Sequence, residues 1–475
     1  MSASMMTRRQ ALKSLLALGV GAAALAACGA TPTPQVVEKV VEKEVTKIVE
    51  GTPQVVKETV VVKETQVVER VVTGQAPPQE VTIAYWSLEN AEGERKGFID
   101  PFEKAHPGVK VDAQIVPWDA YIQKYQSLSA AGQAPDVAFV SIAWIYDWAK
   151  AGIVLNLGPW MELRFGSQQL DPKLYYTQFI DGLRYPDTSG DFYACPYEWV
   201  TIVFYYNKDM FDAAGLEYPN AQWTYDDVLQ AAQKLTKREG DRPIQFGVNS
   251  GWGYSVSDSS IRSNGGQLLS ADYKKALVNS PENVQTYQWW VDLISKYQVA
   301  PTPSEAGSQG GPTFTTGKVA MMIEGVWAIP DLRNQKEFKW DITVLPKGKQ
   351  GRKVVAWPNS YCVSSRSKHP DLAWELIVAA LDPNRPANTV GIGKVPITRK
   401  LAEDPVWLEA DLDPKNKRAI LDTEPDAVNL TCGPRWNEWR DALDKELQLA
   451  YIGETSVPEA VEKANAAVQA VLDRP

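Results

Sequence analysis

Carboxylates are the best candidates for catalytic groups in this sequence, because the other usual groups are scarce. The chain has only two histidines, His106 and His369, and each stands directly before a proline. This argues against a serine–histidine–acid triad, a multi-histidine zinc site and histidine acid–base catalysis. Glu198 and Glu324 stand beside tryptophan or glycine and could be the two carboxyls of a glycoside hydrolase. We favour the alternative that both are hydrogen-bond acceptors or cap residues, and so predict that the chain is not an enzyme.

Two glycine-containing stretches could suggest phosphate binding, but neither completes a motif. Residues 311–318 resemble a phosphate-binding loop, yet the spacing is one residue too long and Val319 replaces the magnesium-binding Ser or Thr. Gly391 and Gly393 are an isolated pair without such spacing. No spacing typical of zinc or calcium ligands is present either. We therefore expect no metal and no cofactor.

The aromatic and charged residues favour binding of a small ligand. The chain has 17 Trp and 19 Tyr against 11 Phe, and Trp and Tyr combine an apolar face with a polar group. Residues of this kind are enriched at wet binding surfaces. The 475 residues carry a net charge of -9, whereas nucleic-acid binding needs clustered positive charge. The composition therefore argues against nucleic acid as the main partner.

The first residues have the pattern of an export signal. Arg8 and Arg9 resemble a twin-arginine signal and precede an apolar run, Leu15 to Ala27, that is too short to span a bilayer of ~30 Å. The run ends in Leu-Ala-Ala before Cys28, which resembles the lipobox of bacterial lipoproteins. We therefore predict removal of residues 1–27, lipidation of Cys28, and anchoring to the outer face of the cell membrane, periplasmic or at the cell surface.

Residues 28–78 form a low-complexity linker. Valine pairs recur about every four residues with Glu and Lys between them, and no Leu, Phe or Trp is present to build a core. Valine is a poor former of isolated helices. We predict a solvated spacer, weakly helical at most, with a trimeric stalk as the alternative.

From residue 80 onward, short β-rich runs alternate with helical patterns, which predicts parallel sheets covered by helices. The predicted strands cover 81–86, 109–116, 136–140, 200–206, 246–249 and 361–364. The predicted helices cover 98–105, 119–131, 228–237, 281–297 and 370–381. This alternation indicates two α/β lobes. Cys195, Cys362 and Cys432 leave an odd number of thiols for that region, so either one disulfide or none is possible.

A series of blocks resembles, in order, the extracellular solute-binding proteins of bacterial ABC importers, family 1, the group that includes maltose-binding protein. The blocks are residues 102–111, 131–137, 205–227, 314–327 and 367–375, and the resemblance extends over about 81–470. It implies an α/β fold of two lobes with a ligand cleft between them and strands that cross a hinge. The lobes would be discontinuous, with 79–199 plus 346–382 in lobe 1 and 200–345 plus 383–475 in lobe 2.

The same resemblance implies a function. The protein would capture a carbohydrate and deliver it to the membrane permease of an ABC importer, with no chemistry of its own. Another organic solute in the same fold, such as a sugar phosphate or polyol, is the main alternative. A sensory module and a lipid-anchored hydrolase are further ones. Val200 and Trp252 stand where maltose-binding protein has carboxylates, so the ligand need not be a maltodextrin.

The predicted ligand-binding residues follow strand ends, where loops of α/β sheets meet a cleft. Flat aromatic faces bury the C–H face of a pyranose, while carboxylate, amide and guanidinium groups pair with its hydroxyls. Trp327 stands at a position that the family uses for a stacking aromatic. The full set is Trp86, Glu89, Asn90, Ser141, Trp144, Tyr197, Glu198, Trp199, Trp252, Tyr254, Trp327, Trp357, Asn359, Arg435 and Trp436.

Overall fold

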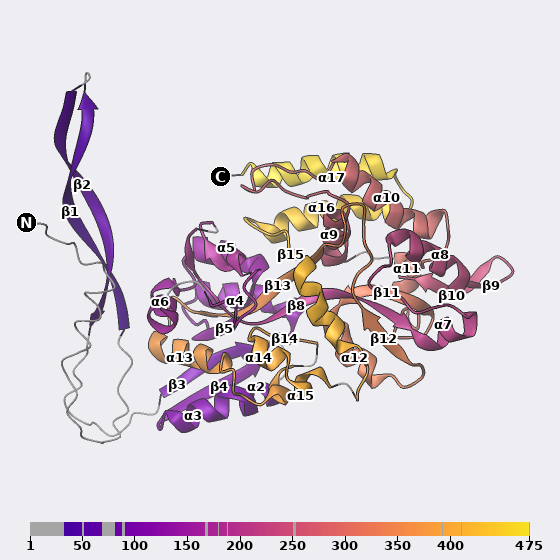
Figure 1. Cartoon of the computed structure of the whole chain (residues 1–475), viewed down its shortest axis with the longest axis horizontal. Coiled ribbons are helices and arrows are strands. Elements are labelled where there is room, and N and C mark those ends of the chain that lie inside the picture. Colours follow the sequence, from indigo (N-terminus) through magenta and orange to yellow (C-terminus); the bar gives the residue numbers. More distant parts are fainter. Residues whose placement is uncertain are drawn as a thin grey trace, which may run out of the picture. The chain divides into compact units, whose positions relative to one another are not determined.

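The computed structural model of the chain contains two compact units, residues 1–73 and 74–475 (Figure 1). It describes residues 33–49, 52–68, 81–87, 91–166, 170–178, 180–187, 189–249, 253–391, 393–409 and 411–474. Cys28, Glu89, Asn90 and Trp252, and the predicted export signal, therefore lie outside the described residues.

The first unit is a β-hairpin. Strands β1 (Thr33–Val49) and β2 (Thr52–Val68) pair in antiparallel register along their full length. Three pairs of valines oppose each other, such as Val40 and Val61, and three pairs have opposite charges, such as Glu44 and Lys57. The role of a spacer stays a prediction, whereas the weak helical character that we allowed was wrong for these residues. The reason is that β-branched valine loses less side-chain freedom in a strand than in a helix.

The second unit begins with the predicted alternation of strands and helices. Strand β3 (Val81–Ser87) lies between β4 (Val109–Ile115) and β5 (Val137–Ser141) and is parallel to both. We call this half of the unit lobe 1. The helices beside these strands are α2 (Ala91–Glu94), η1 (Arg95–Ile99), α3 (Asp100–Ala105), α4 (Trp118–Ala130), α5 (Ile142–Lys150) and α6 (Gly158–Phe165).

One long strand, β8 (Cys195–Asn207), joins the two halves of the main sheet, and all of its residues are buried. Its first part pairs with β13 (Val354–Val363), which in turn pairs with β5 of lobe 1. Its second part pairs with β11 (Val319–Gly325) and β12 (Trp340–Thr343). This strand therefore crosses between the lobes, as Figure 1 shows, and the two-lobed α/β fold is confirmed.

Lobe 2 is the half that contains β11, β12 and β10 (Arg242–Val248), where β10 runs parallel to β11. Helix α8 (Tyr225–Leu235) begins at a capping box formed by Thr224 and Asp227. The other elements here are α7 (Lys208–Ala214), β9 (Lys237–Glu239), α9 (Tyr254–Ser263), α10 (Pro281–Ser295), α11 (Pro303–Gly307), η3 (Val326–Ala328) and α12 (Ile329–Asn334).

The C-terminal part of the chain contacts both lobes. After α13 (Pro370–Ala380), strand β14 (Val395–Pro396) pairs with the lobe 1 end of β8, and the Arg399 amide donates to the Leu174 carbonyl. We assigned 383–475 to lobe 2 as a block, so this part lies closer to lobe 1 than expected, and the boundaries stay a prediction. The later elements are η4 (Ala387–Thr389), α14 (Arg399–Ala402), α15 (Pro405–Leu408), η5 (Lys417–Asp426), β15 (Ala427–Asn429), α16 (Trp436–Tyr451) and α17 (Val457–Leu472).

The three cysteines of the second unit, Cys195, Cys362 and Cys432, are buried free thiols. Burial raises the pKa of each of these thiols, which keeps them protonated and unreactive. Within the described residues, no helix combines the length and apolar character needed to cross a membrane.

Candidate functional site

A small polar cavity lies at the carboxyl end of β3, where lobe 1 meets β8 and the segment after α13. It encloses about 20 Å³, room for about one water molecule. Its lining contains two carboxyl groups and two cationic groups, so their formal charges balance. The lining residues are Ser87, Glu94, Phe98, Tyr197, Glu198, Arg385, Thr389, Val390, Gly391 and Lys394.

One carboxylate of the cavity, Glu198, has two partners on one of its oxygens. The β8–β13 register places Asn359 opposite Glu198, and the Asn359 Nδ2 atom donates to Glu198 Oε1 at 2.9 Å. The Lys394 Nζ atom lies 3.4 Å from the same oxygen. A buried carboxylate with an amide donor and an ammonium group beside it is compensated for its loss of water. The predicted residues Glu198 and Asn359 are thus brought together.

The other carboxyl, Glu94, is satisfied on one oxygen. Its Oε1 atom accepts hydrogen bonds from Ser87 Oγ at 2.6 Å and from the Tyr361 hydroxyl at 3.2 Å. Its Oε2 atom is buried and has no hydrogen-bond partner in the part of the chain that the structure describes. Burial raises the pKa of Glu94 to about 8, with a smaller contribution from the negative charge of Glu198.

Arg385, a cationic residue of the same cavity, also has a buried polar atom without a hydrogen-bond partner among the described residues. This atom is Nε, and 7% of the residue is exposed. Burial lowers the pKa of Arg385, while the charges of Glu198 and Glu94 oppose that shift. Its guanidinium still remains charged at any physiological pH. Gly97 lies beside Arg385, and a Cβ there would lie only 2.7 Å from Thr389 Oγ1, so a larger residue would require Thr389 to shift.

An aromatic pair with one exposed ring lies near this cavity. The rings of Trp327 and Trp357 are 5.5 Å apart, and Trp327 is 38% exposed. Trp357 lies two residues before Asn359 on β13, so both point to the same face of the strand. Gly393, with φ of +76°, packs so closely on the Val326 carbonyl that a Cβ would lie 2.3 Å from its oxygen. The backbone before Trp327 therefore contacts the segment that lines the cavity.

Most of the other predicted aromatics are buried in this conformation. Trp144 packs on Tyr121 and Trp148 inside lobe 1, where 1% of it is exposed. Tyr197 stacks on Tyr361 with ring centroids 4.0 Å apart, at the wall of the cavity. The remaining members of this buried group are Trp86, Trp199, Tyr254 and Trp436. Apart from Tyr197, we do not include these rings in the candidate site, and their contact with a ligand stays a prediction.

Two predicted polar residues have local structural partners instead. The Ser141 hydroxyl accepts from the Ala143 amide at 3.3 Å and caps α5. The guanidinium of Arg435 donates to the backbone carbonyls of Val471 and Arg474, at the end of α17. These contacts occupy both side chains, and neither residue lines the cavity.

The sequence prediction missed Glu94, Arg385 and Lys394, and also Trp118. Trp118 is 48% exposed and its ring lies 4.7 Å from that of Trp144, at the start of α4. Trp118 comes shortly after strand β4, so the rule that selected residues after the other strands could also have selected it. Gly391 and Gly393, just before Lys394, could have drawn attention to that segment, although we assigned them no role in the sequence analysis.

The two glutamates considered for hydrolysis lie far apart. Glu324 on β11 pairs with Val203, five residues along β8 from Glu198. At ~3.3 Å per residue, the separation along the strand is roughly 16 Å. The two carboxyls of a glycoside hydrolase lie about 5–10 Å apart, so these two do not form such a pair. Among the described residues, no group of three or more His, Cys, Asp or Glu side chains could hold a metal ion.

Comparisons with known proteins support the architecture. The sequence matches the family model of bacterial extracellular solute-binding proteins over residues 85–383. A binding protein of Brucella abortus (strain 2308) is 25% identical over 384 residues, covering 78% of this chain and 88% of the relative. The sn-glycerol-3-phosphate-binding periplasmic protein of that strain is 28% identical over 273 residues, covering 53% of this chain and 59% of the relative.

A solved structure with the same fold is an ABC substrate-binding protein from Listeria monocytogenes in complex with cycloalternan. It superposes with a TM-score of 0.73 at 24% sequence identity, and the match covers 84% of this chain and 100% of that chain.

Proposed function

The chain belongs to the bacterial extracellular solute-binding proteins, and we propose that it captures a carbohydrate in the cleft between its lobes. The observation that carries this proposal is the Trp327–Trp357 pair, in which the Trp327 ring is exposed, near the polar cavity. An aromatic platform buries the apolar face of a pyranose, and neighbouring carboxyl, amide and guanidinium groups bind its hydroxyls. The cycloalternan complex of similar fold supports a sugar ligand.

The second part of the proposal is delivery. The protein is exported, held at the outer face of the membrane by a lipid on Cys28, and passes its sugar to the permease of an ABC importer. The lipobox and the paired arginines at the start of the sequence support the anchor. Cys28→Ala should abolish lipid labelling and release the protein or leave it unprocessed. Normal processing with continued membrane attachment of this variant would contradict the lipid anchor.

Two other functions each have one observation in their favour. The relative that binds sn-glycerol 3-phosphate favours a phosphorylated solute. Glu94 and Glu198, which line one cavity and include a carboxyl with a pKa raised to about 8, favour glycoside hydrolysis. We prefer a binding protein because Glu198 is held by Asn359 and Lys394 rather than left to react.

A thermal-shift screen of the whole protein against sugars, polyols and sugar phosphates tests capture. A ligand at a hundred times its Kd stabilises the native state by about 2.7 kcal/mol, which gives a clear rise in Tm. We expect at least one sugar to raise Tm and no turnover of that sugar on long incubation. The absence of any shift across the screen would contradict the proposal. Release of reducing sugar by the wild type that is lost in Glu198→Gln would favour a hydrolase instead.

A further inference from the structure

Two hydrogen-bond donors of the cavity lack an acceptor. The Arg385 Nε atom is buried and has no hydrogen-bond partner among the described residues. The Glu94 Oε1 atom already accepts hydrogen bonds from Ser87 and Tyr361, so the proton of the neutral carboxyl belongs on Oε2. Oε2 is buried and likewise has no partner in the described part of the chain. Buried polar groups without partners are rare in native proteins, so these two atoms indicate an acceptor that comes from outside the chain.

The charges around the cavity indicate that this acceptor is negative. Burial raises the pKa of Glu94 to about 8, so its carboxyl is mostly neutral at pH 7. Arg385 and Lys394 each carry a formal positive charge, whereas Glu198, 3.4 Å from Lys394, then supplies the one negative charge among the described lining residues. A buried charge without compensation destabilises the native state. At neutral pH the cavity therefore has one positive charge in excess.

The size of the cavity limits what can enter it. It has room for about one water molecule, and a halide ion is only slightly larger than water. A free phosphate or sulfate ion needs several times that space, although a single oxygen of a larger anionic group could enter. A water molecule or a neutral hydroxyl would satisfy the two donors but would leave the excess charge uncompensated.

We propose that Glu94 and Arg385 form an anion-binding site, filled by chloride or by one oxygen of an anionic group on a solute. This inference goes beyond carbohydrate capture and does not depend on it. The Arg385 guanidinium would compensate the charge of the anion, and the neutral Glu94 carboxyl would donate a hydrogen bond to it.

Anion binding at this site should depend on pH. The ionised form of Glu94 repels an anion, so protonation of Glu94 and binding of the anion strengthen each other. With a pKa of about 8, nearly all of Glu94 is neutral at pH 6.5 but only about a tenth of it at pH 9. The apparent Kd of the anion should therefore be about tenfold higher at pH 9. The titratable and charged groups that face Glu94 are Tyr85 on β3, Tyr121 on α4, Tyr197 and Glu198 on β8, Tyr361 on β13, and Arg385 and Lys394 on the segment after α13.

The test is a chloride titration of the whole protein, followed by thermal unfolding. Sodium chloride replaces sodium methanesulfonate at constant ionic strength, because methanesulfonate is too large for the cavity. Chloride should raise the Tm of the wild type at pH 6.5, and about tenfold more chloride should be needed for the same rise at pH 9. Arg385→Met should abolish the rise at both pH values. Glu94→Gln should keep the rise and lose its dependence on pH.

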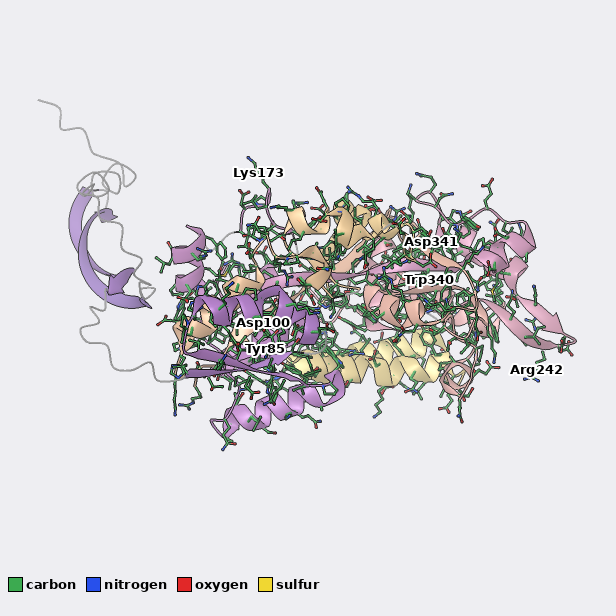
Figure 2. All side chains as sticks on the ribbon, turned by 90° about the horizontal axis from the view of Figure 1, so that it is seen from below. Tyr85, Asp100, Lys173, Arg242, Trp340 and Asp341 are labelled. Carbon is green, nitrogen blue, oxygen red and sulfur yellow. The ribbon has the colours of Figure 1, made fainter. Side chains whose placement is uncertain are left out.

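Asp341→Asn is the matched control, because Asp341 is another buried carboxyl whose pKa is raised by burial. Figure 2 shows Asp341, on β12 in lobe 2, well apart from Tyr85, whose hydroxyl donates to Tyr361 beside Glu94. This variant should respond to chloride as the wild type does, and it measures any general effect of the salt on stability.

A second arm of the experiment identifies the source of the anion. Glucuronate and glucose 6-phosphate are each compared with glucose by calorimetric titration in methanesulfonate. An acidic sugar that binds at least tenfold more tightly than glucose, and that is weakened by both chloride and Arg385→Met, would show that the solute carries the anion. Equal binding of the acidic and neutral sugars, together with the chloride effect, would show that the site takes a free anion.

A structural measurement covers the case in which Arg385→Met does not fold. Crystals of the wild type soaked in bromide should give an anomalous peak within hydrogen-bond distance of the Arg385 guanidinium. A cavity without bromide, in crystals whose protein also lacks any preference for acidic sugars, would overturn the proposal.

The remaining outcomes separate this site from carbohydrate capture. A rise in Tm that persists in Arg385→Met, or that has the same chloride dependence at pH 6.5 and pH 9, would overturn the anion site. Binding of a neutral sugar without any effect of chloride or of an acidic group would also overturn it, while carbohydrate capture would stand. A chloride effect without binding of any sugar would support the anion site and contradict carbohydrate capture.

Discussion

Two clusters of charged side chains within the described residues differ in how completely they are paired. In the first, Glu409 accepts hydrogen bonds from Arg333 and Lys417, each at 2.9 Å. The same two cations also donate to the backbone carbonyls of Asp413 and Trp407. In the second, Glu94 and Arg385 each keep a buried polar atom without a partner in the described structure.

The pKa directions follow the same division. Burial of Glu409 acts to raise its pKa, but the hydrogen bonds from Arg333 and Lys417 outweigh burial and lower it. Burial of Glu94 is not outweighed, so the pKa of Glu94 is raised. A complete cluster stabilises the fold, whereas an incomplete one is ready for an external partner. Substitutions should therefore affect stability in the first cluster and ligand binding in the second.

The largest effect should come from breaking the complete cluster. Glu409→Gln removes the negative charge shared by two cations, one of which, Lys417, is almost fully buried. The free energy of unfolding should fall by about 3 kcal/mol, because buried charge is left uncompensated. Chemical denaturation measures this free energy of unfolding. The control is Glu403→Gln, at an exposed position nearby, whose free energy of unfolding should stay within about 0.5 kcal/mol of the wild-type value. An equal loss of unfolding free energy in Glu409→Gln and Glu403→Gln would contradict the claim that the Glu409 cluster stabilises the fold.

The pH dependence of stability should identify the incomplete cluster. The pKa of Glu94 is about 8 in the native state against 4.5 for the unperturbed group, so between these values the native state binds more protons than the unfolded one. Unfolding free energy should therefore fall as pH rises through this range, by roughly 2–4 kcal/mol in total.

Glu94→Gln should abolish the part of the pH-dependent fall in unfolding free energy that comes from Glu94. The variant and the wild type should have the same stability at about pH 4, and the variant should be the more stable at about pH 9. Because other buried carboxyls also titrate, the difference between the two proteins is the quantity to plot. A difference that does not change with pH would show that Glu94 keeps an ordinary pKa.

Trp327 provides a smaller effect, on affinity alone. Burying its exposed ring against a sugar should contribute about 1.5–3 kcal/mol, so Trp327→Ala should raise Kd by roughly tenfold to a hundredfold. Melting of the unliganded protein should hardly change, since the ring is partly in water. Trp144→Ala is the contrast, because it opens a cavity in the core and should lower stability with or without ligand. A destabilised Trp327→Ala with normal affinity would remove Trp327 from the site.

Local patterns predicted the fold of the lobes because each pattern depends on nearby residues. Strand alternation, the capping box at Thr224 and the apolar run within β8 all act over a few positions, and the corresponding elements formed. The helical character of the linker was wrong because valine spacing of about four residues also fits a paired hairpin. The spacing of residues alone cannot distinguish a helix from a hairpin when no core residues are present.

The candidate site was predicted only where strand ends mark it. Trp144 and Trp327 both follow strands, but only the tertiary packing buries one ring and exposes the other. Glu198 and Asn359 meet through the pairing of strands far apart in the sequence, and their contact needed the register. The missing partners of Glu94 and Arg385 are a property of the folded interior, so no sequence pattern could reveal them.

The most direct test of this account is a crystal structure of the protein with the sugar that raises Tm most in the thermal-shift screen. We predict an anion or a ligand oxygen within hydrogen-bond distance of Glu94 Oε2 and of the Arg385 guanidinium, with a ring face against Trp327. A sugar bound elsewhere, with Glu94 and Arg385 still lacking partners, would contradict the claim that this pair binds an external partner.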